Sequence, residues 1–330
     1  MKIDLPLALE AGALAEVAAV AAAAEAAGFD GVSTSEMTSD PLLQLTVAAG
    51  ATERVELITN IVVAFARSPM TLAVQGRALQ DYSQGRLILG LGSQIKPHIE
   101  KRFSMPWSAP AARMHEYIRA LRAIWHSWES GEPLAFRGQF YTHTLMTPMF
   151  TPPSRFPAPR IYLAAVGPRM TAVAGEVADG LLVHPFSTEA YVREVTLPAL
   201  ANPDIDVVSA AFVVTGRDER EIAESAAAVR DQIAFYGSTP AYLPVFEHHG
   251  WGELGVELNR LSKTRDPDKW RQMGTLIDDD VLREFAVVGE PDRVGPLLRA
   301  RWGDLITRYE LNHVGIQDPA LQLEIARSLR

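Results

Sequence analysis

Residues 55–92, VELITNIVVAFARSPMTLAVQGRALQDYSQGRLILGLG, decide the fold that this sequence predicts. Two apolar runs, Val55–Val63 and Leu87–Leu91, predict buried strands, and the stretch between them predicts a helix over Pro69–Tyr82, with proline at a tolerated early position. Two neighbouring strands that are joined through a helix run parallel in one sheet. This stretch therefore predicts an α/β fold.

The same alternation continues along the rest of the chain. Apolar runs predict further strands at Ile3–Leu9, Val32–Ser35, Ile161–Val166, Gly180–His184, Val207–Thr215 and Leu305–Leu311. Helices are predicted at Leu14–Ala27, Pro41–Thr52, Arg113–Glu129, Met170–Ala178 and Glu189–Leu200. Eight strands in this alternation favour a closed TIM (β/α)8 barrel over a doubly wound sheet.

Two segments interrupt the alternation, and we expect them to be insertions into a single domain that spans residues 1–330. Residues 130–160 are rich in proline, glycine and aromatics, with a predicted hairpin around Leu134–Phe136 and Phe140–Thr142. Residues 238–280 are longer and partly helical. Long connections of this kind are usually lids or binding loops. The alternative, two domains divided near Arg160, would leave each half with an unclosed parallel sheet.

Composition narrows the classes of function. The 330 residues are 48% hydrophobic, carry a formal net charge of −9 and include no cysteine. Thiolate nucleophiles and cysteine-ligated metals are therefore excluded. Without clustered positive charge, neither nucleic acid nor an anionic membrane is an expected partner. The N-terminal residues lack a signal-peptide pattern, so we expect a cytoplasmic protein that acts on a small molecule.

Familiar catalytic motifs are missing from the sequence. The eight histidines form neither HExxH nor HxH, and no GxSxG elbow occurs, so no metal site and no hydrolase triad are predicted. A redox cofactor that brings its own chemistry would explain so few reactive side chains. In a barrel of this type the site forms at the C-terminal ends of the strands.

One strand end has the features of an anion site. Ala164–Gly167 leads into a helix that begins at about Pro168, where free N–H groups and the helix dipole favour a phosphate. Arg169 would add positive charge there, although a solvated surface arginine is the equal alternative.

Five stretches in register resemble the luciferase-like monooxygenase superfamily. They are Gly28–Val32, Leu57–Pro69, Ser83–Gly92, Ile161–Pro168 and Ala174–Gly180. In detail the sequence resembles the branch of coenzyme F420-dependent oxidoreductases, through Val63–Pro69, His98–Phe103 and Leu145–Pro148.

The resemblance implies a TIM barrel, usually dimeric, that holds an isoalloxazine-like ring at the strand ends. It also implies a non-prolyl cis peptide behind the ring, by position Asn60-Ile61, with an ordinary trans strand end as the alternative. The expected cofactor contacts are Asn60, Ile61, Val62 and Ser93 at the ring, Gln94 and His98 beside it, and Ala165, Val166, Gly167 and Arg169 at the phosphate side of the tail.

The sequence departs from the F420-dependent pattern at two positions. Where relatives carry an Asp-His pair after the second strand, this chain has Glu36 and Met37, and Ile95 replaces a second carboxylate. Glu36 is the predicted acid/base or ring contact, with a salt-bridged carboxylate at the barrel rim as the alternative. The predicted substrate pocket consists of Met37, Phe65, Trp107 and His184, although the aromatics could equally be core and His184 structural.

These inferences predict hydride transfer between C5 of F420 and a small organic substrate. The alternatives are an FMN-dependent monooxygenase with a separate reductase, and a non-catalytic protein that binds a flavin or deazaflavin. A homodimer is also expected, because small residues on two helices would permit close packing across a two-fold axis; the alternative is that they pack within the barrel wall. These residues are Ala48, Ala49, Gly50, Ala73, Gly76 and Ala78.

Overall fold

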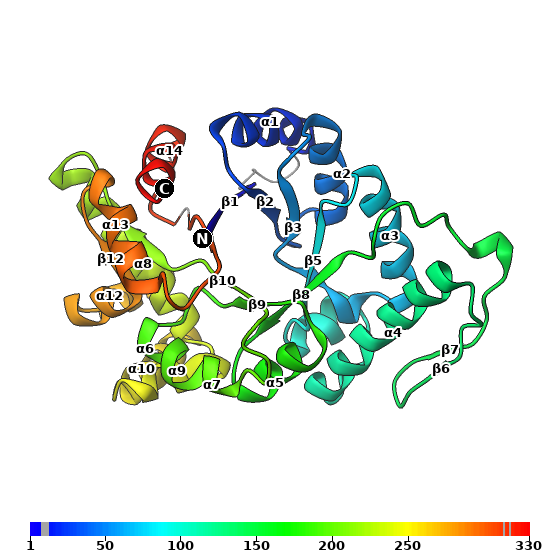
Figure 1. Ribbon diagram of the computed structural model, residues 1–330. Coiled ribbons are helices and arrows are strands. Elements are labelled where there is room, and N and C mark those ends of the chain that lie inside the picture. Colours follow the sequence, from blue (N-terminus) through cyan, green and yellow to red (C-terminus); the bar gives the residue numbers. More distant parts are fainter. Residues whose placement is uncertain (8–12, 313, 317) are drawn as a thin grey trace.

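A computed structural model describes residues 1–7, 13–312, 314–316 and 318–330 of the chain. Parallel strands close into an eight-stranded barrel, which confirms the predicted fold class (Figure 1). Around the barrel the order is β3 (Glu56–Thr59), β2 (Gly31–Thr34), β1 (Lys2–Pro6), β13 (Arg308–Glu310), β10 (Asp206–Ser209), β9 (Gly180–Val183), β8 (Arg160–Ala165) and β5 (Leu87–Gly92). Pairing of β3 with β5 completes the ring. The short strand β4 (Val62–Val63), which follows β3 in the chain, pairs with the C-terminal end of β5.

Helices surround the barrel (Figure 1). They are α1 (Val17–Ala27), α2 (Pro41–Ala51), α3 (Pro69–Tyr82), α4 (Pro110–Ser130), α5 (Pro168–Val177), α13 (Pro291–Trp302) and α14 (Pro319–Ser328). Their starts follow local sequence rules: the Ser68 hydroxyl accepts a hydrogen bond from the Thr71 N–H at 3.1 Å at the start of α3. The Asp40 carboxylate does the same for Leu42 at 2.8 Å at the start of α2. None of the described helices is long and apolar enough to cross a membrane.

Apolar side chains fill the middle of the barrel. Ile58, Ile88, Tyr162, Leu182 and Val208, each from a different strand, form one buried cluster. Because side chains alternate between the two faces of a strand, residues two positions further along also point inward. This parity directs His184 and Glu310 into the C-terminal end of the barrel, called the barrel mouth below.

Charged side chains close the opposite end of the barrel. We call Asp4, Glu56, Arg160, Asp206 and Arg308 the N-terminal plug. Arg308 forms two hydrogen bonds to Asp4, at 2.9 and 2.6 Å, and an ion pair with Glu56. Arg160 joins Glu56 to Asp206. The plug links four strands, β1, β3, β8 and β10, to β13.

The predicted strand Val207–Thr215 is wrong as a single element. It divides into β10, which stays in the barrel, and β11 (Phe212–Val214), which pairs with β12 (Ala286–Val288), a strand that was not predicted. A continuous apolar run does not reveal a change of sheet, because both strands are buried.

The predicted insertion at 238–280 belongs to a larger unit, residues 212–288, which we call the helical appendage. It contains β11, β12, α8 (Glu219–Gly237), η6 (Pro240–Tyr242), α9 (Leu243–His248), α10 (Gly252–Ser262), α11 (Lys269–Gly274) and α12 (Asp279–Phe285). A second apolar core holds it together and includes Phe186, which follows β9. The Phe186 ring lies 4.6 Å from that of Phe285 and 5.1 Å from that of Phe246, centre to centre.

Other predicted elements differ from the structure in their bounds or are divided into shorter elements. The hairpin in residues 130–160 is confirmed as β6 (Phe136–Arg137) and β7 (Thr142–His143). The helix at Glu189–Leu200 is interrupted, as α6 (Glu189–Tyr191), the π-helical turn η5 (Val192–Thr196) and α7 (Leu197–Ala199). Leu14–Glu16 forms the 3-10 turn η1 ahead of α1. The predicted end of the first strand, at Ala8 and Leu9, lies outside the described residues. Because β8 pairs with β5, the sheet is continuous across Arg160.

Candidate functional site

The barrel mouth brings several predicted residues together. Glu36 follows β2, Asn60 to Val62 follow or form the ends of β3 and β4, Ser93 follows β5, Ala165 ends β8 and His184 follows β9. Glycine makes the close approach possible on one side: a Cβ added to Gly92 would lie 2.8 Å from the Ile61 side chain. The end of β5 therefore packs closely against the segment after β3.

The segment from Asn60 to Val63 is held tightly in place. The Asn60-Ile61 peptide is cis, as the resemblance implied. Both residues of this peptide are hydrogen-bonded to β2 or to the loop after it. The Asn60 N–H donates to the Thr34 carbonyl at 2.8 Å, and the Glu36 N–H donates to the Ile61 carbonyl at 3.0 Å. The two backbone bonds fix the segment against the neighbouring strand.

Glu36 reinforces the same segment with its side chain. Its carboxylate accepts the Val63 N–H at 2.7 Å and pairs with the Arg67 guanidinium at 2.7 and 2.9 Å. Arg67 also pairs with Asp40 at 2.9 Å, and these partners raise its pKa. The Glu36 carboxylate is thus a salt-bridged group at the rim, the alternative that the sequence left open. Its predicted role in proton transfer stays a prediction.

Asn60 also reaches across the barrel interior. Its side-chain amide donates to the Glu310 carboxylate, on β13, at 2.9 Å. Ser33 on β2 bonds the same carboxylate, and burial raises the pKa of Glu310. Glu310 was not among the predicted site residues. The available signal was its place two residues after Arg308 in a predicted strand, which puts both side chains on one face.

His184 lies in the mouth and is fixed as a neutral ring. Its Nδ1 accepts the Phe186 N–H at 3.1 Å, so the ring proton lies on Nε2, which faces the Tyr242 hydroxyl at 3.0 Å. The two rings stack at 4.4 Å, and Tyr236 packs edge-on at 4.7 Å. Burial lowers the pKa of His184 to about 4. Tyr236 and Tyr242 come from the appendage and were not predicted, because only the fold places them over β9.

The predicted aromatic wall forms near η2 (Ala64–Ala66), the turn after β4. The Phe65 and Trp107 rings meet edge to face at 5.8 Å, and the Arg113 guanidinium lies 4.5 Å from the centre of the Phe65 ring. Phe65 is fully buried and Trp107 half-buried, so Phe65 belongs to the core and Trp107 presents the accessible edge.

Apolar side chains surround the opening. Met37, Ile95 and Val166, here called the apolar rim, follow β2, β5 and β8 and are exposed by 69%, 43% and 41%. The Arg102 side chain from η3 (His98–Arg102) donates to the Met37 carbonyl at 2.6 Å and so ties two rim loops together. Exposed apolar groups at the strand ends favour an apolar ligand over a charged one.

The predicted phosphate site lies at the start of α5. Gly167 precedes this helix with a φ of 80°, a positive value that favours glycine, and a Cβ there would meet nothing within 4 Å. The first N–H groups of an α-helix have no partner within the helix. Arg169 and His98 are exposed, and Gln94 bends the chain after β5 with a φ of 59°.

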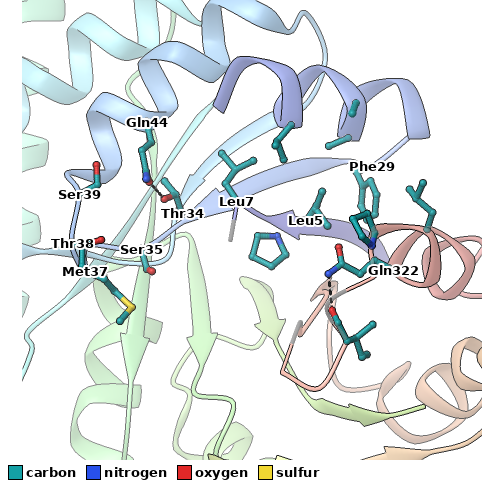
Figure 2. A pocket seen from close by; sticks show the side chains of 17 residues that line it. Leu5, Leu7, Phe29, Thr34, Ser35, Met37, Thr38, Ser39, Gln44 and Gln322 are labelled. Carbon is teal, nitrogen blue, oxygen red and sulfur yellow. Dashed lines mark hydrogen bonds between the residues drawn. The ribbon is translucent and has the colours of Figure 1, made fainter. Parts of the chain in front are cut away.

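A cavity of about 740 Å³ adjoins the mouth, between α1, β1, β2 and α14 (Figure 2). Figure 2 shows Ser35, Met37 and Thr38 at one end, and Leu5, Phe29 and Gln322 at the other. Met37, a predicted pocket residue, therefore lies between the mouth and this cavity. Among the described residues, no group of three or more His, Cys, Asp or Glu side chains is placed to hold a metal ion.

Comparison with known proteins places these features in context. A sequence profile described as luciferase-like monooxygenase matches residues 2–307. An uncharacterised protein of Mycobacterium tuberculosis is 53% identical over 305 residues, 89% of each chain. A second protein of that organism, provisionally named a coenzyme F420-dependent oxidoreductase, is 29% identical over 304 residues, 84% of each chain. The coenzyme F420-dependent tetrahydromethanopterin reductase of Methanopyrus kandleri shares the fold, with a TM-score of 0.77, 20% identity, and coverage of 98% of this chain and 96% of its own.

Proposed function

Since the chain belongs to the luciferase-like monooxygenase family, we propose that it is an F420-dependent oxidoreductase that transfers a hydride to or from a small, apolar organic substrate. The observation that carries the proposal is the arrangement of the mouth. The segment Asn60–Val63, anchored by Glu36, faces the glycine-lined end of β5, and the start of α5 lies on the same rim.

The residues present fit a deazaflavin. A flat ring needs a fixed surface, which Asn60 to Val63 would supply, and Gly92 lets the end of β5 pack closely against Ile61 in that segment. The start of α5, with Gly167 before it, suits the phosphate of the tail. Ser93, Gln94 and His98 lie on the loop after β5 and would contact the ring or the tail from that side.

When bound, the cofactor supplies the hydride and the protein supplies position and protection from water. Trp107 and Met37 cover the opening with apolar surface, which keeps water from the reacting atoms. The Nε2–H of neutral His184 donates a hydrogen bond to the Tyr242 hydroxyl, which can in turn donate a hydrogen bond to a substrate oxygen and so orient it. Burial raises the pKa of Tyr242 to about 12, which keeps that hydroxyl protonated at neutral pH.

F420 is preferred over FMN because the 29% identical relative bears that cofactor in its name, and because the sequence matches the F420-dependent branch at Val63–Pro69 and His98–Phe103. The family description favours the second candidate, an FMN-dependent monooxygenase that works with a separate reductase.

Equilibrium binding of F420 and of FMN to the purified apo-protein, followed by fluorescence, tests the proposal. Tight binding of F420 with weak binding of FMN supports it. Preference for FMN, together with oxygen-dependent turnover, would replace it with the monooxygenase. Binding of neither would leave the non-catalytic alternative.

A further inference from the structure

Glu310 is a carboxyl group inside the barrel mouth that the proposed function has not used. It extends inward from β13 and remains partly exposed to the mouth. Its bond to Asn60 joins residues 250 positions apart, across the barrel from β13 to the end of β3. The carboxyl group therefore lies beside the segment that would support the ring.

Four polar or charged side chains act on Glu310. Ser33 on β2 and Asn60, which follows β3, bond its carboxylate, Asp4 on β1 repels its charge, and Arg308 on its own strand attracts it. Arg308 forms two hydrogen bonds to Asp4 and a further ion pair with Glu56, so most of its charge is engaged in the N-terminal plug. Burial has the largest effect on the pKa of Glu310, and it raises that pKa.

Glu36, the other carboxyl group near the mouth that the sequence singled out, is placed differently. Both of its oxygens contact Arg67, and one also accepts the Val63 N–H. These contacts engage both oxygens of the Glu36 carboxylate in holding the segment after β3. Among the described residues, none forms a comparable ion pair with Glu310, and its two neutral donors, Asn60 and Ser33, leave it able to gain and lose a proton.

Building on the proposed function, we propose that Glu310 is the acid–base residue of the site, and that it exchanges a proton with the substrate as the hydride moves. In the reducing direction, a bound reduced deazaflavin would supply a hydride to the carbon of a substrate C=O group. The C=O double bond becomes a single bond, and the oxygen takes the proton of Glu310. The resulting carboxylate is stabilised by Asn60 and Ser33, and solvent in the mouth restores the proton. Oxidation of an alcohol runs through the same steps in reverse.

Two variants and one control test this role. Glu310→Gln keeps the size and the hydrogen-bonding capacity of the side chain but holds no exchangeable acid, and Glu310→Ala opens space for a small acid. Glu253→Gln, at an exposed position in α10, is the matched control. Single-turnover oxidation of reduced F420 by a panel of apolar ketones measures the chemistry, and fluorescence measures F420 affinity.

We expect Glu310→Gln to bind F420 within about threefold of the wild type and to lose about 100-fold or more in single-turnover rate, the range for general acid–base catalysis. Added formate or acetate should partly restore the rate of Glu310→Ala. Carbon-13 NMR of glutamate-labelled protein gives a second readout. The carboxyl signal of Glu310 is identified as the one that the wild type shows and Glu310→Gln lacks. In the wild type, this signal should titrate above the ordinary glutamate range and shift when F420 is added.

The outcomes separate this inference from the proposed function. Wild-type protein that binds no F420 overturns both. Protein that binds F420 while Glu310→Gln keeps the wild-type rate and pH profile overturns only the role of Glu310. If no ketone in the panel reacts, the NMR titration decides: an ordinary pKa, or a signal that does not respond to F420, overturns the inference.

Discussion

At the scale of single residues, the site depends on side chains that hold others in place. The two oxygens of Glu36 bind Arg67 and the Val63 N–H. His184 is similarly fixed by Phe186 and Tyr242. Such fixed groups give a bound ligand a rigid surface, and each can be tested by removing one partner.

Replacing Glu36 by Gln should weaken F420 binding about tenfold, equivalent to about 1.4 kcal/mol. The ion pair with Arg67 is lost, and the segment that supports the ring becomes less well fixed. Titration of F420 fluorescence measures the effect. In a double-mutant cycle with Arg67→Met, a coupling energy near zero would show that the pair does not act through the segment.

Replacing Tyr242 by Phe should lower the free energy of unfolding by about 1–3 kcal/mol, because the Nε2–H of His184 loses its acceptor in a buried place. Urea denaturation followed by circular dichroism measures this. Tyr82→Phe, on the exposed face of α3, is the control and should change stability little. Equal stability of the two variants would contradict the assigned tautomer of His184.

At the scale of elements, the approach of β5 to the segment after β3 decides the shape of the mouth. Gly92→Ala places a methyl group 2.8 Å from the Ile61 side chain, so that segment must move. We expect a loss of about 1–3 kcal/mol in stability and weaker F420 binding.

Gly252→Ala provides the comparison, because its added Cβ would meet only the Glu247 side chain, at 3.4 Å. Thermal denaturation and F420 titration of both variants measure the difference. Similar behaviour of the two variants would show that the end of β5 is not in contact with the site.

At the scale of the whole molecule, the N-terminal plug should make stability depend on pH. Arg308, Lys2 and Arg160 lower the pKa of Glu56 to about 2, although burial alone would raise it. A carboxylate with a depressed pKa in the folded state stabilises the protein above its unfolded pKa, and this stability is lost as the pH falls through the folded value.

For Glu56 the contribution is about 3 kcal/mol, present above about pH 4.5 and lost progressively towards pH 2. Urea denaturation across this range should show a steeper acid loss in the wild type than in Glu56→Gln. If the free energy of unfolding fell equally with pH in the two proteins, the predicted contribution of Glu56 in the plug would be rejected.

The predicted dimer belongs to the same scale. Ala48, Ala49, Ala73 and Gly76 are buried within the chain, so these four pack in the barrel wall, the alternative that the sequence left open. Exposed Leu43 on α2 and Val74 on α3 are the better candidates for a two-fold contact. Light scattering should give the mass of a dimer, and Val74→Glu should shift it towards the monomer; a monomeric wild type would reject the prediction.

Much of this architecture is a local property of the chain. Hydrophobic periodicity, proline at helix starts and glycine at turns predict the barrel strands and most of the helices that cover them, because these signals depend on neighbours a few residues apart. The same signals place Asn60, Ser93, Ala165 and His184 at strand ends, and a parallel barrel gathers strand ends on one face.

The remaining features depend on contacts between distant parts of the chain, and these only the tertiary structure decided. The division of Val207–Thr215 into β10 and β11 follows from the pairing of β11 with β12. The meeting of Asn60 with Glu310, and of His184 with Tyr242, follows from closure of the barrel and from the fold of the appendage. Periodicity shows which face of an element is buried, but it does not show which distant side chain that face meets.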